Sequence, residues 1–183
     1  MKQLKSMTYH MIRTDKEITD ASVLRKILKS SSFMTVAMCK NNEPYMVSLS
    51  FGYDETRNCI YFHCATEGKK LDYLKANNRI WAQALLDYGY VQGECDHRYA
   101  SVHFNGKVTF IEDRNEKLHA IQTMINQLDK NPTRLLTKLK DEKPATTLTD
   151  KAGTAPIDKL GTARIGRIEI ESMTGKKNKE LTI

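Results

Sequence analysis

Short segments in which hydrophobic and polar residues alternate occur throughout the chain, and this period of two is typical of half-buried β-strands. The clearest alternation spans 44–51, where Tyr45 and Val47 share one face of the predicted strand and Met46 and Ser48 share the other. The segments predicted as strands are 33–39, 44–51, 59–65, 79–86, 100–111 and 163–171. Most of them are joined by short polar turns, which favours antiparallel pairing.

Three other segments have apolar residues spaced three or four positions apart, which is the period of an α-helix. Helices are therefore predicted over 18–29, 112–128 and 131–140. Asp20 or Thr19 can cap the first helix, because both side chains can accept a hydrogen bond from a first-turn N–H group.

The remaining segments are short or polar. A short helix with Thr66 as its N-cap is predicted to follow the third strand and to reach Leu74. By composition, 87–98 is predicted to be an irregular connection, 143–159 a flexible loop and 173–183 a polar tail.

This order of elements decides between fold classes. Strands joined mostly by hairpin loops, with few helices between them, do not form a parallel βαβ sheet and favour an antiparallel barrel. We expect a single domain over 1–183, mainly β with helices, of the α+β type, whose six strands form the barrel.

The composition is that of an ordinary globular protein. Hydrophobic residues make up 40% of the chain and charged residues 28%, so wholesale disorder is not expected. No apolar stretch approaches the roughly 18–20 residues of a membrane-spanning helix, and no membrane partner is predicted. The four cysteines form no Cys-x-x-Cys pair, which predicts reduced thiols and a cytoplasmic protein.

The formal net charge of +7 favours an anionic partner. Nucleic acid, an acidic membrane surface and a phosphorylated small molecule would all meet that description. Lys and Arg are scattered, however, and form no basic arm or Arg-rich helix. Such a distribution usually solvates a surface, so nucleic-acid binding is not expected.

The most informative local feature is the junction between the third strand and the short helix that follows it. Lys69 and Lys70 fall in the first turn of that helix, where the positive end of the helix dipole disfavours cations. A bound phosphate would compensate both lysines and the open N–H groups. The alternative is that both side chains simply point into water.

Other candidate residues remain ambiguous from the sequence. His63 could act as a base or be a hydrogen-bonded structural residue. His103 shares a strand face with Ser101, and that face could line a pocket or be the wet side of a sheet. The run 94–97 contains acidic, Cys and His residues, but four adjacent side chains do not easily converge on one ion, so no metal site is predicted.

Three segments together resemble the pyridoxamine 5′-phosphate oxidase-like flavin-binding split barrels, and most closely their nitroimidazole-resistance (NimA-like) branch. These segments are 44–53, 60–65 and 67–74, of which the last carries the sequence Glu-Gly-Lys-Lys-Leu. The resemblance covers roughly 15–177. It implies a six-stranded split barrel that forms a homodimer, with a flavin in each of two clefts at the subunit interface.

The resemblance also implies a cofactor site. The implied binding residues are Met46, Val47, Ser48, Leu49, Ser50, His63, Cys64, Ala65, Lys69, Lys70 and Ser101. In the family, the backbone of the strand matching 46–50 runs along the flavin ring, and residues matching 63–65 flank it. The positions of Lys69 and Lys70 take the phosphate, and the position of Ser101 contacts the flavin.

The implied function is that of an FMN-dependent oxidoreductase that reduces small aromatic or nitro compounds. FAD is the alternative cofactor. The partners would be a small-molecule acceptor and a nicotinamide electron donor, with His63 as the catalytic candidate that orients substrate or relays a proton. Relatives often carry Arg where this chain has Ala100, so any contact of that arginine is lost. The C-terminal residues of true pyridoxamine phosphate oxidases are not found, so vitamin oxidation is not expected.

Two alternatives belong to other functional classes. A flavin carrier or sensor would bind the cofactor without turnover. A haem protein of the split-barrel type would need a histidine ligand, for which His97, His103 and His119 are the candidates.

Overall fold

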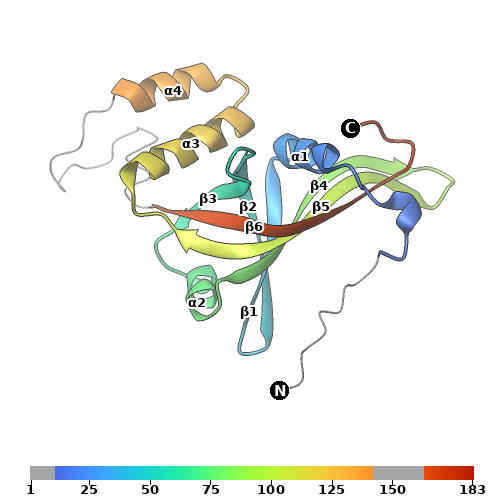
Figure 1. Ribbon diagram of the computed structural model, residues 1–183, viewed down its shortest axis with the longest axis horizontal. Coiled ribbons are helices and arrows are strands. Elements are labelled where there is room, and N and C mark those ends of the chain that lie inside the picture. Colours follow the sequence, from blue (N-terminus) through green and yellow to red (C-terminus); the bar gives the residue numbers. More distant parts are fainter. Residues whose placement is uncertain (1–10, 142–162) are drawn as a thin grey trace.

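A computed structural model describes residues 11–141 and 163–183 of the 183-residue chain. In these ranges six strands form a closed antiparallel barrel in the order β1-β2-β3-β6-β5-β4 (Figure 1). The strands are β1 (Phe33–Lys40), β2 (Glu43–Asp54), β3 (Cys59–Ala65), β4 (Arg79–Val91), β5 (Asp96–Phe110) and β6 (Ala163–Lys177). The prediction of a mainly β, six-stranded antiparallel barrel with helices is confirmed. The predicted loop at 143–159 lies outside the described residues.

The remaining elements of the described residues are helices. They are the short 3₁₀ helix η1 (Thr14–Lys16) and the α-helices α1 (Ala21–Ser30), α2 (Lys69–Ala76), α3 (Arg114–Leu128) and α4 (Pro132–Asp141). The Asp20 side chain accepts a hydrogen bond from the backbone N–H of Ser22 and so caps α1, as one of the two predicted alternatives. Helix α2 begins later than predicted, with Gly68 and not Thr66 as its N-cap. Within the described ranges, no helix has both the length and the hydrophobicity of a membrane span.

The main hydrophobic core fills the barrel. Inward-facing residues of the strands, such as Phe51, Phe62 and Phe104, are almost completely buried there. Helix α1 adds Ile27 and Leu28 to the same cluster, so its apolar face packs against the barrel. The alternation that predicts these strands is therefore the alternation between the barrel interior and the outer surface.

Helix α3 packs on the outside of β2 and β3 and forms a second, smaller core (Figure 1). Tyr61 of β3 and Met124 of α3 are buried in it. The helix approaches β2 closely at Gly52, where an added Cβ would lie 2.7 Å from the backbone nitrogen of Met124. Only glycine leaves room for the helix at this position.

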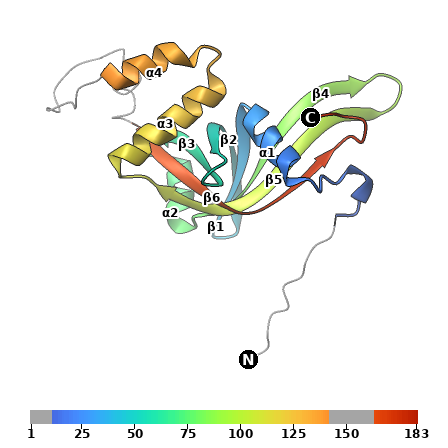
Figure 2. The same ribbon diagram turned by 45° about the horizontal axis from the view of Figure 1, so that its top comes forward.

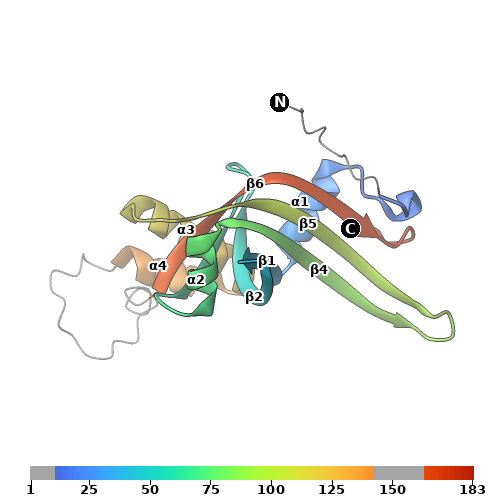
Figure 3. The same cartoon turned by 90° about the horizontal axis from the view of Figure 1, so that it is seen from below.

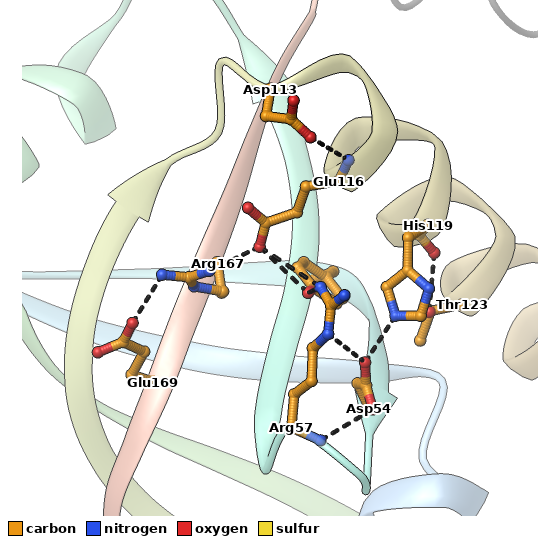
Figure 4. A network of polar contacts seen from close by, with 9 residues as sticks. Asp54, Arg57, Asp113, Glu116, His119, Thr123, Arg167 and Glu169 are labelled. Atoms are coloured by element: carbon orange, nitrogen blue, oxygen red, sulfur yellow. Dashed lines mark hydrogen bonds and ion pairs between the residues drawn. The ribbon is translucent and has the colours of Figure 1, made fainter.

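A polar network surrounds this second core and fixes α3 to the barrel (Figure 4). Nε2 of His119 on α3 lies 2.6 Å from a carboxylate oxygen of the buried Asp54. Glu116 of α3 accepts a 2.6 Å hydrogen bond from Arg167 of β6. The Tyr61 hydroxyl accepts a hydrogen bond from Arg57 and lies 3.3 Å from Glu116, to which it donates.

Two segments are more regular than the sequence suggests. The prediction of an irregular connection at 87–98 is wrong in large part. Strands β4 and β5 continue into this segment as a hairpin, and their last pair is Val91 with Asp96. The predicted polar tail also begins too early, because β6 continues to Lys177 and pairs with the first half of β5. The hairpin extension is largely exposed to solvent, and the β6 extension has Gly175 as its buried residue, so both lack the apolar alternation by which a strand is recognised.

The extended β4–β5 hairpin gives the molecule its long axis. Figures 2 and 3 show its tip projecting from the barrel, at the end opposite to α3 and α4. A register shift between Asp87 and Tyr90 marks an irregularity in the ladder, next to Gly89 with a backbone φ of 90°. The hairpin therefore offers an outer surface that neither α3 nor α4 covers.

Candidate functional site

The side chains of β2 divide between the two faces of the barrel wall. Met46, Ser48 and Ser50 are exposed on the outer face, whereas Val47 and Leu49 pack against the core inside. A ligand on the outer face would therefore contact the side chains of Met46, Ser48 and Ser50. Val47 and Leu49 could contribute only their backbone groups.

Strand β3 continues this outer surface. His63 and Ala65 are exposed, and Cys64 is buried between them. The ladder between β2 and β3 ends at the pair Phe51–Phe62, so the two strands separate beyond this point. We call the unpaired stretch beyond this pair, with the outer face of β2 on one side and His63 and Ala65 on the other, the opening between β2 and β3.

Helix α2 begins where β3 ends. Its N-cap Gly68 has a φ of 117°, which L-residues rarely adopt, and it has no side chain to accept a hydrogen bond from the first turn. The Leu71 N–H donates to the Gly68 carbonyl oxygen at 2.9 Å, whereas the N–H groups of Lys69 and Lys70 remain open to an external acceptor, together with the positive end of the helix dipole. This geometry is suited to an anion.

The two predicted lysines point to different neighbours. Lys69 Nζ lies 3.6 Å from a carboxylate oxygen of Glu43 and 4.8 Å from the ring centre of Tyr45. Lys70 is half-buried and close enough to Cys64 to influence that thiol. Arg164, which pairs with Cys64 across β3 and β6, acts on the thiol from the other side.

These cations surround a thiol that is not a reactive one. Burial raises the pKa of Cys64, and the positive charges of Lys70 and Arg164 only partly oppose that increase. The larger consequence is that Lys70 and Arg164 both lie near Cys64, where β3, α2 and β6 come together, while Lys69 of the same helix turn contacts Glu43. The sequence pattern identifies Lys69 and Lys70, but not Arg164, because nothing local indicates that the start of β6 pairs with β3.

A groove of about 400 Å³ lies on the outer face of β4, β5 and β6. It is lined by Gln83, Leu85, Asp87, His97, Tyr99, Ser101, His103 and Lys176. The alternatives for the strand face of Ser101 and His103 are thus resolved, because both residues line a pocket. Ser101 is 1% exposed, and its hydroxyl has no hydrogen-bond partner in the described residues. Such a group is unusual in a folded protein and leaves a hydroxyl in the groove that a ligand or a water molecule can pair with.

The groove and the lysines are not brought together within one chain. Lys69 contacts Glu43, which pairs with Lys40 of β1, whereas Gln83 of the groove pairs with Thr35 of the same strand. Five residues along a strand correspond to about 17 Å. A site that used both regions as one pocket would therefore need a second chain.

Large apolar side chains are exposed on the same outer face. Phe33 is 55% exposed, Met46 66%, Trp81 56% and Leu85 42%. They belong to the adjacent strands β1, β2 and β4, and Ala37 pairs with both Met46 and Trp81. An apolar surface of this kind is typical of a contact with another molecule.

The three candidate haem ligands lie in different surroundings. His119 is held by Asp54 at the second core, and His97 Nε2 lies 2.7 Å from Asp87 on the β4–β5 hairpin. His103 is half-buried in the groove, where burial and the nearby Lys176 lower its pKa. His97 and His103 are six residues apart on one strand, about 20 Å, so the two cannot ligate the same iron.

Comparison with solved structures finds the same fold in proteins of low sequence identity. A candidate 5-nitroimidazole antibiotic resistance protein from Bacteroides thetaiotaomicron is 24% identical, with a TM-score of 0.64 over 87% of this chain and 85% of that one. An FAD-binding protein from Mesorhizobium loti is 21% identical, with a TM-score of 0.58 over 87% and 95%. An FAD and heme binding protein from Mycobacterium smegmatis is 15% identical, with a TM-score of 0.61 over 92% and 76%.

Family membership comes from the sequence itself. No curated protein matches the chain. The family model described as pyridoxamine 5′-phosphate oxidase matches residues 20–152, which is more than half of the chain and includes β1 to β5 with α2 and α3. The chain therefore belongs to the pyridoxamine 5′-phosphate oxidase family.

Proposed function

We propose that this protein binds a flavin, preferably FMN, and uses it to reduce small aromatic or nitro compounds. The observation that carries the proposal is the opening between β2 and β3, which leads to the uncapped start of α2 and its cluster of cations. The fold shared with an FAD-binding protein and with a candidate nitroimidazole-resistance protein supports the same function. We place the chain in the nitroimidazole-resistance branch of its family.

The phosphate would bind at the start of α2. Open N–H groups after Gly68, the ammonium groups of Lys69 and Lys70 and the guanidinium of Arg164 would all favour a doubly negative group there. Lys69 would exchange its contact with Glu43, which is an exposed ion pair and therefore weak, for the phosphate. FMN ends in such a phosphate, whereas the adenylate of FAD would have to project outward.

The ring system of the flavin would lie along the outer face of β2. Backbone groups of 46–50 would face the ring edge, and His63 and Ala65 would flank it from β3. The flavin supplies the electron transfer, and the protein binds and orients the ring and its partner molecules. His63 is exposed beside the opening, where it could orient the acceptor or move a proton.

A second copy of the chain would complete the site. Ser101 lies too far from the lysines of its own chain, so we propose that it reaches the flavin bound mainly by the partner. The exposed apolar side chains of β1, β2 and β4 would form the contact between the two copies. A nicotinamide and a small acceptor would share the open side of the ring.

The proposal is tested first by the absorption spectrum of the purified protein. We expect bands near 375 and 450 nm (approximate values common to oxidised flavins) and release of FMN on heating. A haem spectrum, or a colourless protein that does not bind added FMN, would contradict the proposal. Bound flavin that no acceptor reoxidises would favour a carrier or sensor.

The phosphate site is tested by comparing FMN with riboflavin, which lacks the phosphate. In the double variant Lys69→Gln/Lys70→Gln we expect the Kd of FMN to increase at least about tenfold, because two charge-assisted contacts are lost. The Kd of riboflavin should change little. Lys75→Gln, at the other end of α2, is the matched control. Equal losses for both ligands would place the phosphate elsewhere.

A further inference from the structure

Lys176 gives the groove on β4, β5 and β6 a positive charge. It lies on β6 directly opposite Ser101 of β5, and both side chains line the groove. The groove continues from Ser101 toward Asp87 and His97 on the β4–β5 hairpin. The proposed flavin would contact Ser101 at one end of the groove and would leave the part lined by Gln83, His103 and Lys176 to another ligand.

The charge of Lys176 is not neutralised by its neighbours. Among residues 11–141 and 163–183, its ammonium group forms no ion pair within 4 Å. Asp87 is the acidic residue of the groove, and its carboxylate already accepts hydrogen bonds from the Gly89 backbone and from His97. Asp96, on the same strand as His97, is paired with Lys16 at 3.6 Å. Glu17 forms an isolated β-bridge with Lys176, but the described residues show no ion pair between their side chains within 4 Å, so the ammonium remains available to a ligand.

The other lining groups are suited to a small planar ligand. Burial and the charge of Lys176 lower the pKa of His103, so that its imidazole is neutral at pH 7 and can donate or accept a hydrogen bond. Gln83 adds an amide that can donate or accept a hydrogen bond. A volume of about 400 Å³ accommodates a compound of one or two rings.

We propose that the compound reduced by the flavin carries an anionic group, such as a carboxylate, which binds Lys176 in this groove. This inference rests on the proposed function and defines its substrate class as small aromatic acids. Lys176 is then the residue that determines specificity. Gln83 and His103 would hold the aromatic ring and its polar substituents beside the flavin.

The test compares 4-nitrobenzoate with 4-nitrobenzamide, which have the same shape and differ in charge. Binding is measured by calorimetry and by perturbation of the flavin spectrum. We expect the flavin-loaded protein to bind the benzoate at least about tenfold more tightly, since a charge-assisted hydrogen bond is stronger than a neutral one. Lys176→Gln should abolish that preference, Lys176→Arg should keep it, and the exposed Lys107→Gln of β5 is the control.

Several outcomes would overturn the inference. One is equal binding of the two compounds, and another is a preference that survives in Lys176→Gln. A changed flavin midpoint potential in Lys176→Gln, with an unchanged preference, would mean that the ammonium acts on the flavin and not on the substrate. If the proposed function is wrong, the protein does not bind flavin. Calorimetry on the flavin-free protein still measures whether the groove binds the benzoate more tightly than the benzamide.

Discussion

His63 and Cys64 are neighbours in sequence, yet the barrel wall gives them opposite environments. Cys64 faces the core and its pKa is raised by burial, so its thiol is not an expected nucleophile. His63 faces outward beside the opening between β2 and β3. Of the predicted residues that face the opening from β3, only His63 has a side chain that can transfer a proton near neutral pH.

Replacing His63 tests that role. If the protein binds flavin as proposed, we expect His63→Ala to keep it, with a Kd within about threefold of the wild type, because the phosphate site and the backbone of β2 would provide the main contacts. The rate constant kcat for acceptor reduction should fall about tenfold or more, since a positioned acid or base is lost. Steady-state kinetics and a flavin titration measure the two quantities. Unchanged turnover with bound flavin would show that the histidine is only a neighbour of the cofactor.

For individual residues, part of the candidate site could be predicted from the sequence. Strict alternation in β2 already separates Ser48 from Leu49, and the lysines after Gly68 conflict with the helix dipole. Arg164 and Lys176 could not be predicted in this way. Each acquires its role from a strand that is distant in sequence, and pairing between distant strands leaves no local signal.

At the scale of elements, the β4–β5 hairpin shows why strand ends are hard to predict. Tyr88 and Tyr90 of its outer part are both about half exposed, so neither face of the hairpin shows a hydrophobic alternation. Pairing nevertheless continues to Val91 and Asp96, because each further pair satisfies backbone N–H and C=O groups in the ladder. Asp87 and His97 are brought together by that continuation.

One of the contacts that hold helix α3 on the barrel is made by the buried carboxylate of Asp54. Burial raises the pKa of Asp54, but hydrogen bonds from His119 and from the backbone of Arg57 lower it, and the net shift is downward. A carboxyl group with a lowered pKa in the folded state stabilises that state above its unfolded pKa of about 4. The stabilisation is lost as the pH falls through the lower pKa of the folded state.

The corresponding variant is Asp54→Asn. We expect it to lower the free energy of unfolding by about 1–3 kcal/mol at pH 7, because hydrogen bonds to a charged group are lost. The difference from the wild type should narrow as the pH falls below about 4, where the carboxylate of the unfolded wild type becomes protonated, and should disappear below the lower pKa of the folded state. Urea unfolding at several pH values measures both effects, with the exposed Glu112→Gln as control. A difference that does not depend on pH would mean that the charge of Asp54 is unimportant.

For the whole molecule, the central question is how the two halves of the proposed site meet. The cations at α2 and the groove at Ser101 are both on the outer surface, and the apolar face with Trp81 lies on the strands between them. Covering that face with a second copy would join the cations of one chain to the groove of the other. Flavin binding and dimer formation should therefore depend on each other.

Trp81→Asp tests this dependence. The tryptophan is 56% exposed in the single chain, so the substitution should leave the melting temperature of the fold almost unchanged. A buried charge at the interface should instead prevent association, and we expect sedimentation velocity to show a dimer for the wild type and a monomer for the variant. The Kd of FMN should then increase at least about tenfold, because Ser101 of the partner is absent. Ile12→Asp, at a residue that is 95% exposed and precedes the barrel in sequence, should alter neither property. A monomeric variant with wild-type affinity for FMN would mean that one chain holds the whole site.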